Sequence, residues 1–270
     1  MKEFISDILS YQFLTYGLIV GLCVSVCASL LGVILVLKRY SMIGDGLSHI
    51  SFGALALASV LGLSPLKIAV PLVALAAILL LRFGGKIIKG DSLIAIISSS
   101  ALALGILLIS YSGSGTDMNS YLIGSLYAVE KGDAILSICL SLVVMAIFIF
   151  LYNRIFSVTF DEEFSRATGM KVNFYNTIIA ILVSVTVVIG MRLMGALLIS
   201  ALIVFPALSS MRVFKSFFSV TISSVIISAF CFITGYCLTI IFDSVPAGSA
   251  VTLVNLLVFI VFSIVGVTRK

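Results

Sequence analysis

Long apolar stretches separated by short polar segments run along the whole of this chain. They cover approximately residues 13–37, 43–63, 65–81, 92–111, 134–152, 174–191, 193–211, 216–241 and 249–267. Runs of about 20 apolar residues are typical of helices that cross a bilayer. The pattern predicts an all-α polytopic membrane protein with about nine spans. A hairpin or re-entrant element around Gly190, Met191 and Arg192 would lower the count to eight.

Composition supports this fold class. The chain is 61% hydrophobic and 10% charged, whereas soluble domains are roughly half apolar and a quarter charged. No stretch is long and polar enough to form a separate soluble domain. We therefore expect one transmembrane domain over residues 13–270, preceded by an interfacial segment at residues 1–12 that carries charges of both signs and lacks the pattern of a secretory signal.

The distribution of charge predicts the orientation. If the loops alternate between the two sides, one side holds twelve basic residues: Lys38, Arg39, Arg82, Lys86, Lys89, Arg154, Arg166, Lys171, Arg212, Lys215, Arg269 and Lys270. The other side holds four: Lys2, Lys67, Lys131 and Arg192. Basic loops stay in the cytoplasm. We expect a cell-membrane protein with its N-terminus outside and its C-terminus in the cytoplasm, whose partner is the lipid bilayer and not nucleic acid.

A carboxylate and an imidazole stand four residues apart in one apolar segment. Asp45 precedes His49, the single histidine of the chain, and residues at this spacing share a helix face. Ionisable groups inside a bilayer usually face a cavity or a partner, and both side chains are ligands of first-row transition metals. The pair is a candidate metal site. The alternative is a core histidine that hydrogen-bonds to Ser48 or to a neighbouring carbonyl.

Three further residues bear on the pathway. A helix beginning near Ser41 would hold Asp45 close to the cytoplasmic charges, so a deeper metal site would need extended or unwound backbone at Gly44 and Gly46. Pro206 lies deep in a predicted span, where it frees a carbonyl group and kinks the helix.

The longest polar connection on the predicted cytoplasmic side, residues 153–173, contains the pattern of a short helix near 160–169. Acidic residues stand at its start and Gly169 at its end, as in a capped helix. Phe160 and Phe164, four residues apart, would form an aromatic edge. Such a helix either lies on the membrane surface or docks as a coupling helix on a cytoplasmic motor subunit.

Four stretches in this order resemble the permease subunits of the zinc/manganese ABC importer family, over essentially the full chain. They are Leu37-Lys38-Arg39-Tyr40-Ser41-Met42-Ile43-Gly44-Asp45-Gly46-Leu47-Ser48-His49 with Gly53 beyond, Tyr121-Leu122-Ile123-Gly124-Ser125-Leu126, the segment from Phe160 to Gly169, and Gly195-Ala196-Leu197-Leu198-Ile199-Ser200-Ala201-Leu202-Ile203-Val204-Phe205-Pro206-Ala207. The fold also resembles a shortened vitamin B12 importer permease, which is a type II ABC importer-like transmembrane domain.

The resemblance implies a homodimer of this chain with two copies of a cytoplasmic ATP-binding subunit and an extracellular metal-binding protein. Asp45 and His49 match the family's metal-coordinating positions. The coupling helix would contact the ATPase through Asp161, Glu162, Glu163, Phe164, Arg166 and Gly169. The chain itself is expected to be no enzyme and to carry no intrinsic cofactor, and it has no phosphate-binding Gly-Lys-Ser/Thr loop.

The leading hypothesis is therefore the permease of an ATP-driven importer of Zn²⁺ or Mn²⁺, with zinc favoured because nitrogen ligation suits it. Two alternatives stay open. In a proton-coupled secondary transporter, Asp45 and His49 would relay protons. In an ABC permease for a metal chelate such as haem or a siderophore, the path would be wider and less charged.

Overall fold

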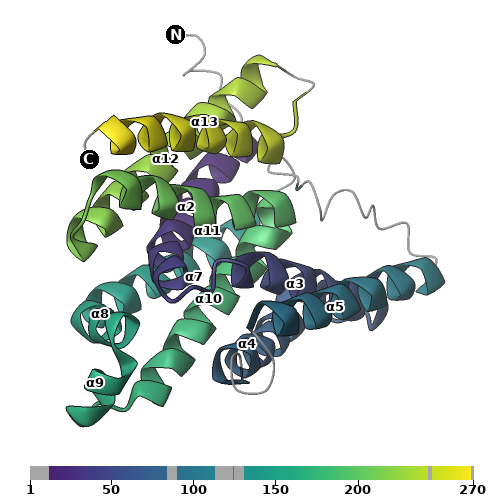
Figure 1. Cartoon of the computed structure of the whole chain (residues 1–270). Helices are drawn as coiled ribbons and strands as arrows, with labels where there is room; N and C mark the ends of the chain where they lie inside the picture. The colour runs from purple at the N-terminus through teal and green to yellow at the C-terminus, as the bar shows by residue number, and fades with distance from the viewer. Residues whose placement is uncertain (1–11, 84–89, 113–123, 125–130, 243–244, 269–270) are drawn as a thin grey trace.

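The computed structural model describes residues 12–83, 90–112, 124, 131–242 and 245–268, and the regular structure within them is helical (Figure 1). The helices are α2 (Gln12–Leu37), α3 (Ile43–Val60), α4 (Pro65–Phe83), α5 (Gly90–Ser112), α7 (Lys131–Phe150), α8 (Tyr152–Phe160), α9 (Glu162–Ala167), α10 (Val172–Met194), α11 (Ala196–Val213), α12 (Phe217–Ile241) and α13 (Ala247–Thr268). The predicted all-α polytopic class is confirmed. The predicted interfacial segment at residues 1–12 lies outside the described residues apart from Gln12, which begins α2.

Eight helices in the described part of the chain are long and apolar enough to cross a membrane. This agrees with the predicted eight or nine spans. The ninth predicted span corresponds to α4, whose apolar part, Pro65–Leu81, is shorter than the eight candidate spans. The hairpin or re-entrant element that would have merged the two spans around Gly190 is not found, because α10 and α11 are each long and apolar enough to cross a membrane and the chain turns between them at Gly195. Gly195 has φ +88°, a conformation that glycine adopts without steric cost, and this places the turn later than predicted.

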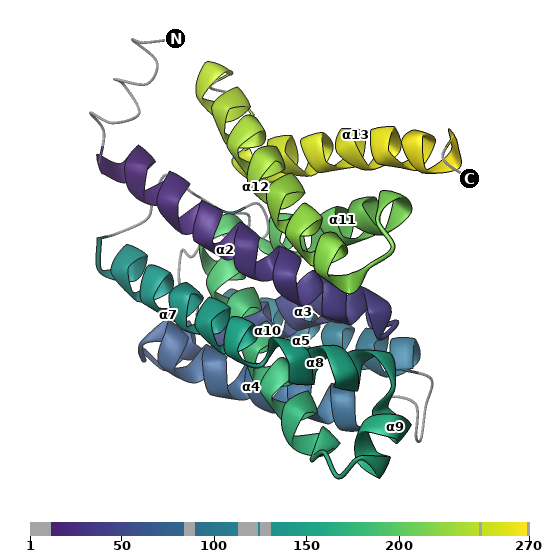
Figure 2. The same ribbon diagram turned by 90° about the vertical axis from the view of Figure 1, so that its left-hand side faces the viewer.

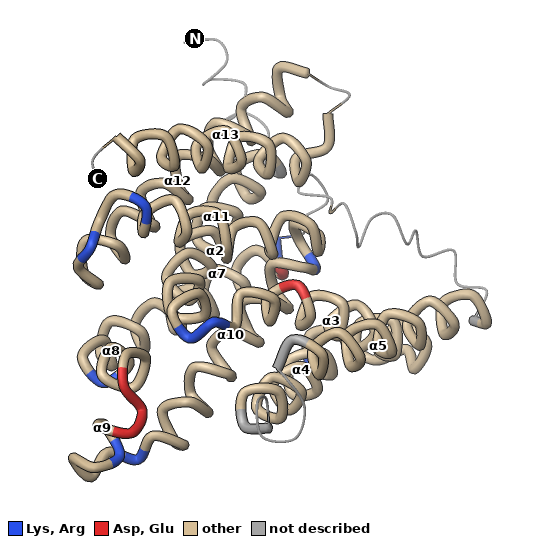
Figure 3. The backbone as a smooth tube through the Cα atoms, viewed as in Figure 1, with Lys and Arg blue, Asp and Glu red and all other residues tan. Residues whose placement is uncertain are grey.

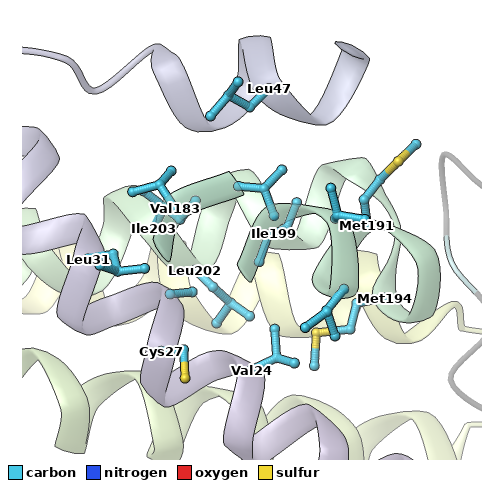
Figure 4. Packing of buried hydrophobic residues seen from close by; sticks show 14 of the residues in the cluster. Val24, Cys27, Leu31, Leu47, Val183, Met191, Met194, Ile199, Leu202 and Ile203 are labelled. Atoms are coloured by element: carbon cyan, nitrogen blue, oxygen red, sulfur yellow. The ribbon is translucent and has the colours of Figure 1, made fainter. Parts of the chain in front are cut away.

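Two helices form the centre of the bundle. In the apolar parts of α2 and α10, 72% of the residues are buried inside the protein, whereas in that of α5 only 22% are buried. Figure 4 shows the core that they share with α3 and α11, including Val24, Leu31, Leu47, Val183 and Leu202. Helix α3, which carries Asp45 and His49, therefore packs against the centre of the protein.

Small residues let the helices approach closely. Gly32 of α2 faces the backbone carbonyl of Ile203 in α11, which leaves no room for a side chain. The Ser228 hydroxyl of α12 donates to the carbonyl of Ser25 in α2 at 2.9 Å. Close backbone contact and interhelical hydrogen bonds of this kind hold membrane helices together, since lipid supplies no hydrophobic drive between them.

One end of the bundle gathers the turns that the charge pattern grouped together. The α2–α3 turn, α9, the α11–α12 turn and the end of α13 lie on the same side in Figure 2; we call this side the α9 end. The opposite end holds an ion pair of Arg192, from the end of α10, with Asp133, from the start of α7, at 2.7 Å. The helices therefore run alternately between two ends, as the loop count assumed.

Candidate functional site

Asp45 and His49 lie on a regular helix. α3 begins at Ile43, whose N–H donates to the Tyr40 carbonyl at 3.0 Å, and the Gly46 N–H donates to the Met42 carbonyl at 3.0 Å. The predicted unwound backbone at Gly44 and Gly46 is therefore wrong. Asp45 stands in the first turn of α3, so the candidate metal site lies near the α9 end.

The two glycines have a packing role instead. A Cβ on Gly44 would lie 2.9 Å from Cδ1 of Ile203 in α11, and one on Gly46 would lie 2.5 Å from Cγ2 of Ile94 in α5. Glycine at these positions lets both neighbours approach the backbone beside Asp45. The first turn of α3 is thereby fixed between α5 and α11.

The carboxylate and the imidazole converge as the spacing predicted. His49 Nε2 lies 3.6 Å from Asp45 Oδ2, and the side chains are 27% and 51% exposed, respectively. Nδ1 of His49 is buried and has no hydrogen-bond partner among the described residues. The Ser48 hydroxyl donates to the Asp45 carbonyl at 2.6 Å and is not paired with the ring. The ring therefore offers Nε2, on the side of the carboxylate, as its accessible nitrogen.

This separation suits a shared metal ion. Two ligand atoms that each bind one zinc ion at about 2.1 Å with tetrahedral geometry lie roughly 3.4 Å apart. No third His, Cys, Asp or Glu joins the pair within the part of the chain that the structure describes. Asp45 is half-exposed, which leaves room for further ligands of an ion held by the pair.

The predicted short helix is present, with narrower bounds. α9 is preceded by Asp161, whose Oδ1 accepts a hydrogen bond from the Phe164 N–H at 2.8 Å. It is followed by Gly169 at φ +82°, and the Met170 N–H donates to the Ser165 carbonyl at 3.0 Å. These are an N-cap and a Schellman-type C-cap, so both ends of α9 are fixed by the sequence.

The predicted aromatic edge of Phe160 and Phe164 is wrong. The backbone of Asp161 is extended, with φ −147° and ψ 99°, and it ends α8 at Phe160. Phe160 packs against Phe156 of the same helix and Phe217 of α12, with ring centroids 4.9 and 6.0 Å apart. Phe164 is 65% exposed. With Glu163 and Arg166, also exposed, it forms the outer face of α9.

Glu162 points the other way, into a contact that the sequence did not reveal. Its Oε1 lies 2.6 Å from Lys38 Nζ, and Asn176 joins both groups by hydrogen bonds of 2.8 and 3.1 Å. Burial raises the pKa of Glu162, but Lys38 and Asn176 more than offset it, so the net pKa lies below the ordinary value. Figure 3 shows a red stretch of acidic residues where α8 meets α9.

Pro206 lies inside α11 and is buried, as predicted. Having no N–H, it leaves the carbonyl group one turn earlier without its helical donor. The Ser210 hydroxyl donates to the Pro206 carbonyl. A role of Pro206 in the transport pathway stays a prediction.

Loss of the α9 N-cap gives a testable effect. We expect Asp161→Ala to weaken α9 by about 1 kcal/mol, because it removes the acceptor for the Phe164 N–H, whereas Asp161→Asn keeps a cap. Hydrogen exchange of the α9 amide groups should be faster in Asp161→Ala than in Asp161→Asn. Equal protection in the two variants would show that the cap does not hold this helix.

The comparisons with known proteins agree with this architecture. Residues 10–266 match the model of the ABC 3 transport family. The manganese import system permease protein ScaB of Streptococcus gordonii is 33% identical over 262 residues, covering 97% of this chain and 94% of that protein. The high-affinity zinc uptake system membrane protein ZnuB of Buchnera aphidicola is 28% identical, covering 90% of this chain and 94% of that protein.

Two solved structures share the fold. The structure of PsaBC from Streptococcus pneumoniae in complex with Fab superposes with a TM-score of 0.87 and 31% identity, covering 97% of this chain and 94% of that chain. An inward-facing ABC transporter described as of the metal-chelate type gives a TM-score of 0.76 at 20% identity, covering 96% and 88%, which supports the fold alone. The chain therefore belongs to the ABC 3 transport family and is a multi-pass membrane permease subunit of an ABC transporter, not its ATPase.

Proposed function

We propose that this chain is the membrane subunit of an ATP-driven importer of divalent transition metal ions, Mn²⁺ or Zn²⁺. The observation that carries the proposal is the placement of Asp45 Oδ2 and His49 Nε2, 3.6 Å apart on one helix face, within reach of a single ion. A charged pair in a membrane-spanning helix is a binding or relay site by default.

For the metal we place manganese first and zinc second. Relatives are named for manganese import in Streptococcus gordonii and for zinc uptake in Buchnera aphidicola. One imidazole and one carboxylate suit both ions. The half-exposed Asp45 leaves room for the several oxygen ligands that manganese takes. The preference for zinc that nitrogen ligation suggested has no support beyond that single nitrogen.

The working unit that we propose is a homodimer of this chain with two cytoplasmic ATP-binding subunits, supplied by an extracellular metal-binding protein. The α9 end then faces the cytoplasm, with the C-terminus inside and the N-terminus outside. This orientation follows the excess of basic residues in the loops of that end. Glu163, Phe164 and Arg166 on the outer face of α9 would contact the ATPase, whose movements would open the site to one side at a time.

Neither alternative function explains the site as well. A proton-coupled secondary transporter needs no ATPase, whereas the chain belongs to an ABC transport family. A permease for a bulky chelate would not need a carboxylate and an imidazole placed to share one ion, and the match to the metal-chelate type structure is one of fold only.

Metal uptake by the complex of this chain with its ATPase, reconstituted in vesicles and supplied with its metal-binding protein, tests the proposal. We expect uptake of ⁵⁴Mn²⁺ that requires ATP on the α9 side and that Zn²⁺ competes with, because both ions fit the pair. A complex whose ATPase carries a defective nucleotide site is the matched control. Uptake driven by a proton gradient without ATP would instead support the secondary transporter.

A further inference from the structure

We propose that Lys38 is a positioning residue that links the coupling helix α9 to the metal-site helix α3. It does so by holding Glu162 and Asn176 against the α2–α3 turn. The inference rests on the proposed function, because it concerns how movement of α9 reaches the metal site.

The first observation is the geometry of the three side chains. Lys38 Nζ donates to Glu162 Oε1 at 2.6 Å and to Asn176 Oδ1 at 2.8 Å, and Asn176 Nδ2 donates to Glu162 Oε1 at 3.1 Å. Each of the three residues contacts the other two. The triangle therefore joins α9, the first turns of α10 and the end of α2.

Burial distinguishes this contact from an ordinary surface ion pair. The Lys38 side chain is 7% exposed and the Glu162 side chain is 45% exposed. Exposed pairs contribute little to stability because water and salt screen them. A lysine ammonium group removed from water, by contrast, needs its charged partner, since a buried charge left alone is costly. Lys38 is thus held to α9 more firmly than surface charges are.

The turn that follows Lys38 is itself fixed. The Tyr40 N–H donates to the Leu35 carbonyl at 2.8 Å, which closes the end of α2 in a Schellman-type arrangement. Arg39 adopts φ +61°, a left-handed conformation that is strained for a residue with a side chain. Because its backbone is fixed in this way, the turn would transmit a displacement of Lys38 to the start of α3.

The metal helix begins directly after this turn. Ile43 donates to Tyr40 at the start of α3, and Asp45 stands in its first turn. Burial raises the pKa of Tyr40, and the negative charge of Glu162 raises it further, so Glu162 also acts on the turn electrostatically. Lys38, which contacts α9, therefore precedes Asp45, the proposed metal ligand, by only seven residues. The backbone between them is hydrogen-bonded in the turn and in the first turn of α3.

The outer and inner sides of α9 face different partners. Glu163, Phe164 and Arg166 are exposed and available to an ATPase, whereas Glu162 faces the bundle. In the preceding helix α8, Phe156 and Phe160 pack against Phe217 of α12. Movement of α9 imposed from the cytoplasm would thus act on α2 and α3 through Lys38.

The test measures how many metal ions the vesicle-reconstituted complex imports for each ATP hydrolysed. We expect Lys38→Met to lower this ratio about tenfold, a typical size of coupling between two sites, while ATP hydrolysis continues. Lys38→Arg and the exchange variant Lys38→Glu with Glu162→Lys should restore most of the ratio, because both keep a cation beside an anion. A change in the amount of folded complex alters both rates together and leaves the ratio unchanged.

Lys215→Met is the matched control. Lys215 is exposed in the α11–α12 turn at the same end of the bundle, so this variant makes the same chemical change and should keep the wild-type ratio. A wild-type ratio in Lys38→Met would overturn the inference. If Lys38→Met does not assemble, the double variant Lys38→Met with Glu162→Gln decides the question by the same ratio, because it removes the ion pair and leaves neither charge without a partner. Absence of ATP-driven uptake in the wild type would overturn the proposed function, and the inference with it.

Discussion

Replacing His49 with alanine is expected to reduce metal uptake about a hundredfold or more, with ATP hydrolysis by the assembled complex retained. In the proposed site, the nitrogen ligand would be His49 Nε2, which lies 3.6 Å from Asp45 Oδ2. Even outer-sphere partners of metal ligands cost about 10–100-fold in affinity when they are lost, so loss of the ligand itself should cost at least as much. Asp45→Asn should have a similar effect, because it removes the charge and keeps the shape.

Ser51→Ala is the control for these two variants. Ser51 is buried on the same helix, and its hydroxyl donates to the Leu47 carbonyl at 2.7 Å within α3, so the change removes a polar group without touching the pair. Uptake by Ser51→Ala should stay close to that of the wild type. Near wild-type uptake by His49→Ala, at equal amounts of complex in the vesicles, would show that the metal passes without this side chain.

The second large effect is on folding. Gly53→Leu is expected to lower the free energy of unfolding by about 3 kcal/mol, as overpacking of a filled interior does. A Cβ at Gly53 of α3 would lie 2.6 Å from the Ala101 carbonyl of α5, and one at Gly105 would lie 2.9 Å from the Gly53 Cα. A backbone atom, unlike a side chain, cannot change rotamer to relieve the clash. Helices α3 and α5 must therefore move apart.

The measurement is the thermal midpoint of the purified chain in detergent, followed by the recovery of folded protein on size exclusion. Gly132→Leu provides the comparison, since a Cβ there meets nothing within 4 Å and surface changes usually stay within about 0.5 kcal/mol. If Gly53→Leu melts at the same temperature as Gly132→Leu, the close contact of α3 with α5 does not limit stability.

The spans could be predicted from the sequence because lipid demands apolar residues over a full helix length. The boundary of α10 and α11 could not be placed, because Arg192 looks like a loop residue in a hydropathy pattern. In the structure it is still helical, paired with Asp133 from a helix far away in sequence. The turn falls instead at Gly195, where backbone conformation and not polarity decides.

The pair of Asp45 and His49 was predictable because both residues lie on one helix, where spacing fixes the face. The unwound backbone at Gly44 and Gly46 was a wrong expectation, since glycine in a membrane helix also marks close packing. Lys38 was counted only as a cytoplasmic charge. Its contact with Glu162 joins residues 124 positions apart, and nothing in local periodicity could place them together.

The separation of Phe160 from Phe164 shows the same limit at short range. The spacing suggested one helix face, but Asp161 ends α8 and caps α9, so the two rings belong to different helices. An aspartate directly before a helical segment is a signal for an N-cap. This signal at Asp161 would have separated α8 from α9 and placed Glu162 at the start of α9.

The central claim, that His49 and Asp45 bind the transported ion, is tested most directly by electron paramagnetic resonance of Mn²⁺ bound to the full chain without a histidine tag. His49 is the single histidine of the sequence, so imidazole nitrogen coupled to the manganese can come from no other residue. We expect nitrogen coupling in the wild type and its loss in His49→Ala, with weaker binding in Asp45→Asn. Manganese bound by the wild type through oxygen ligands alone would contradict the account.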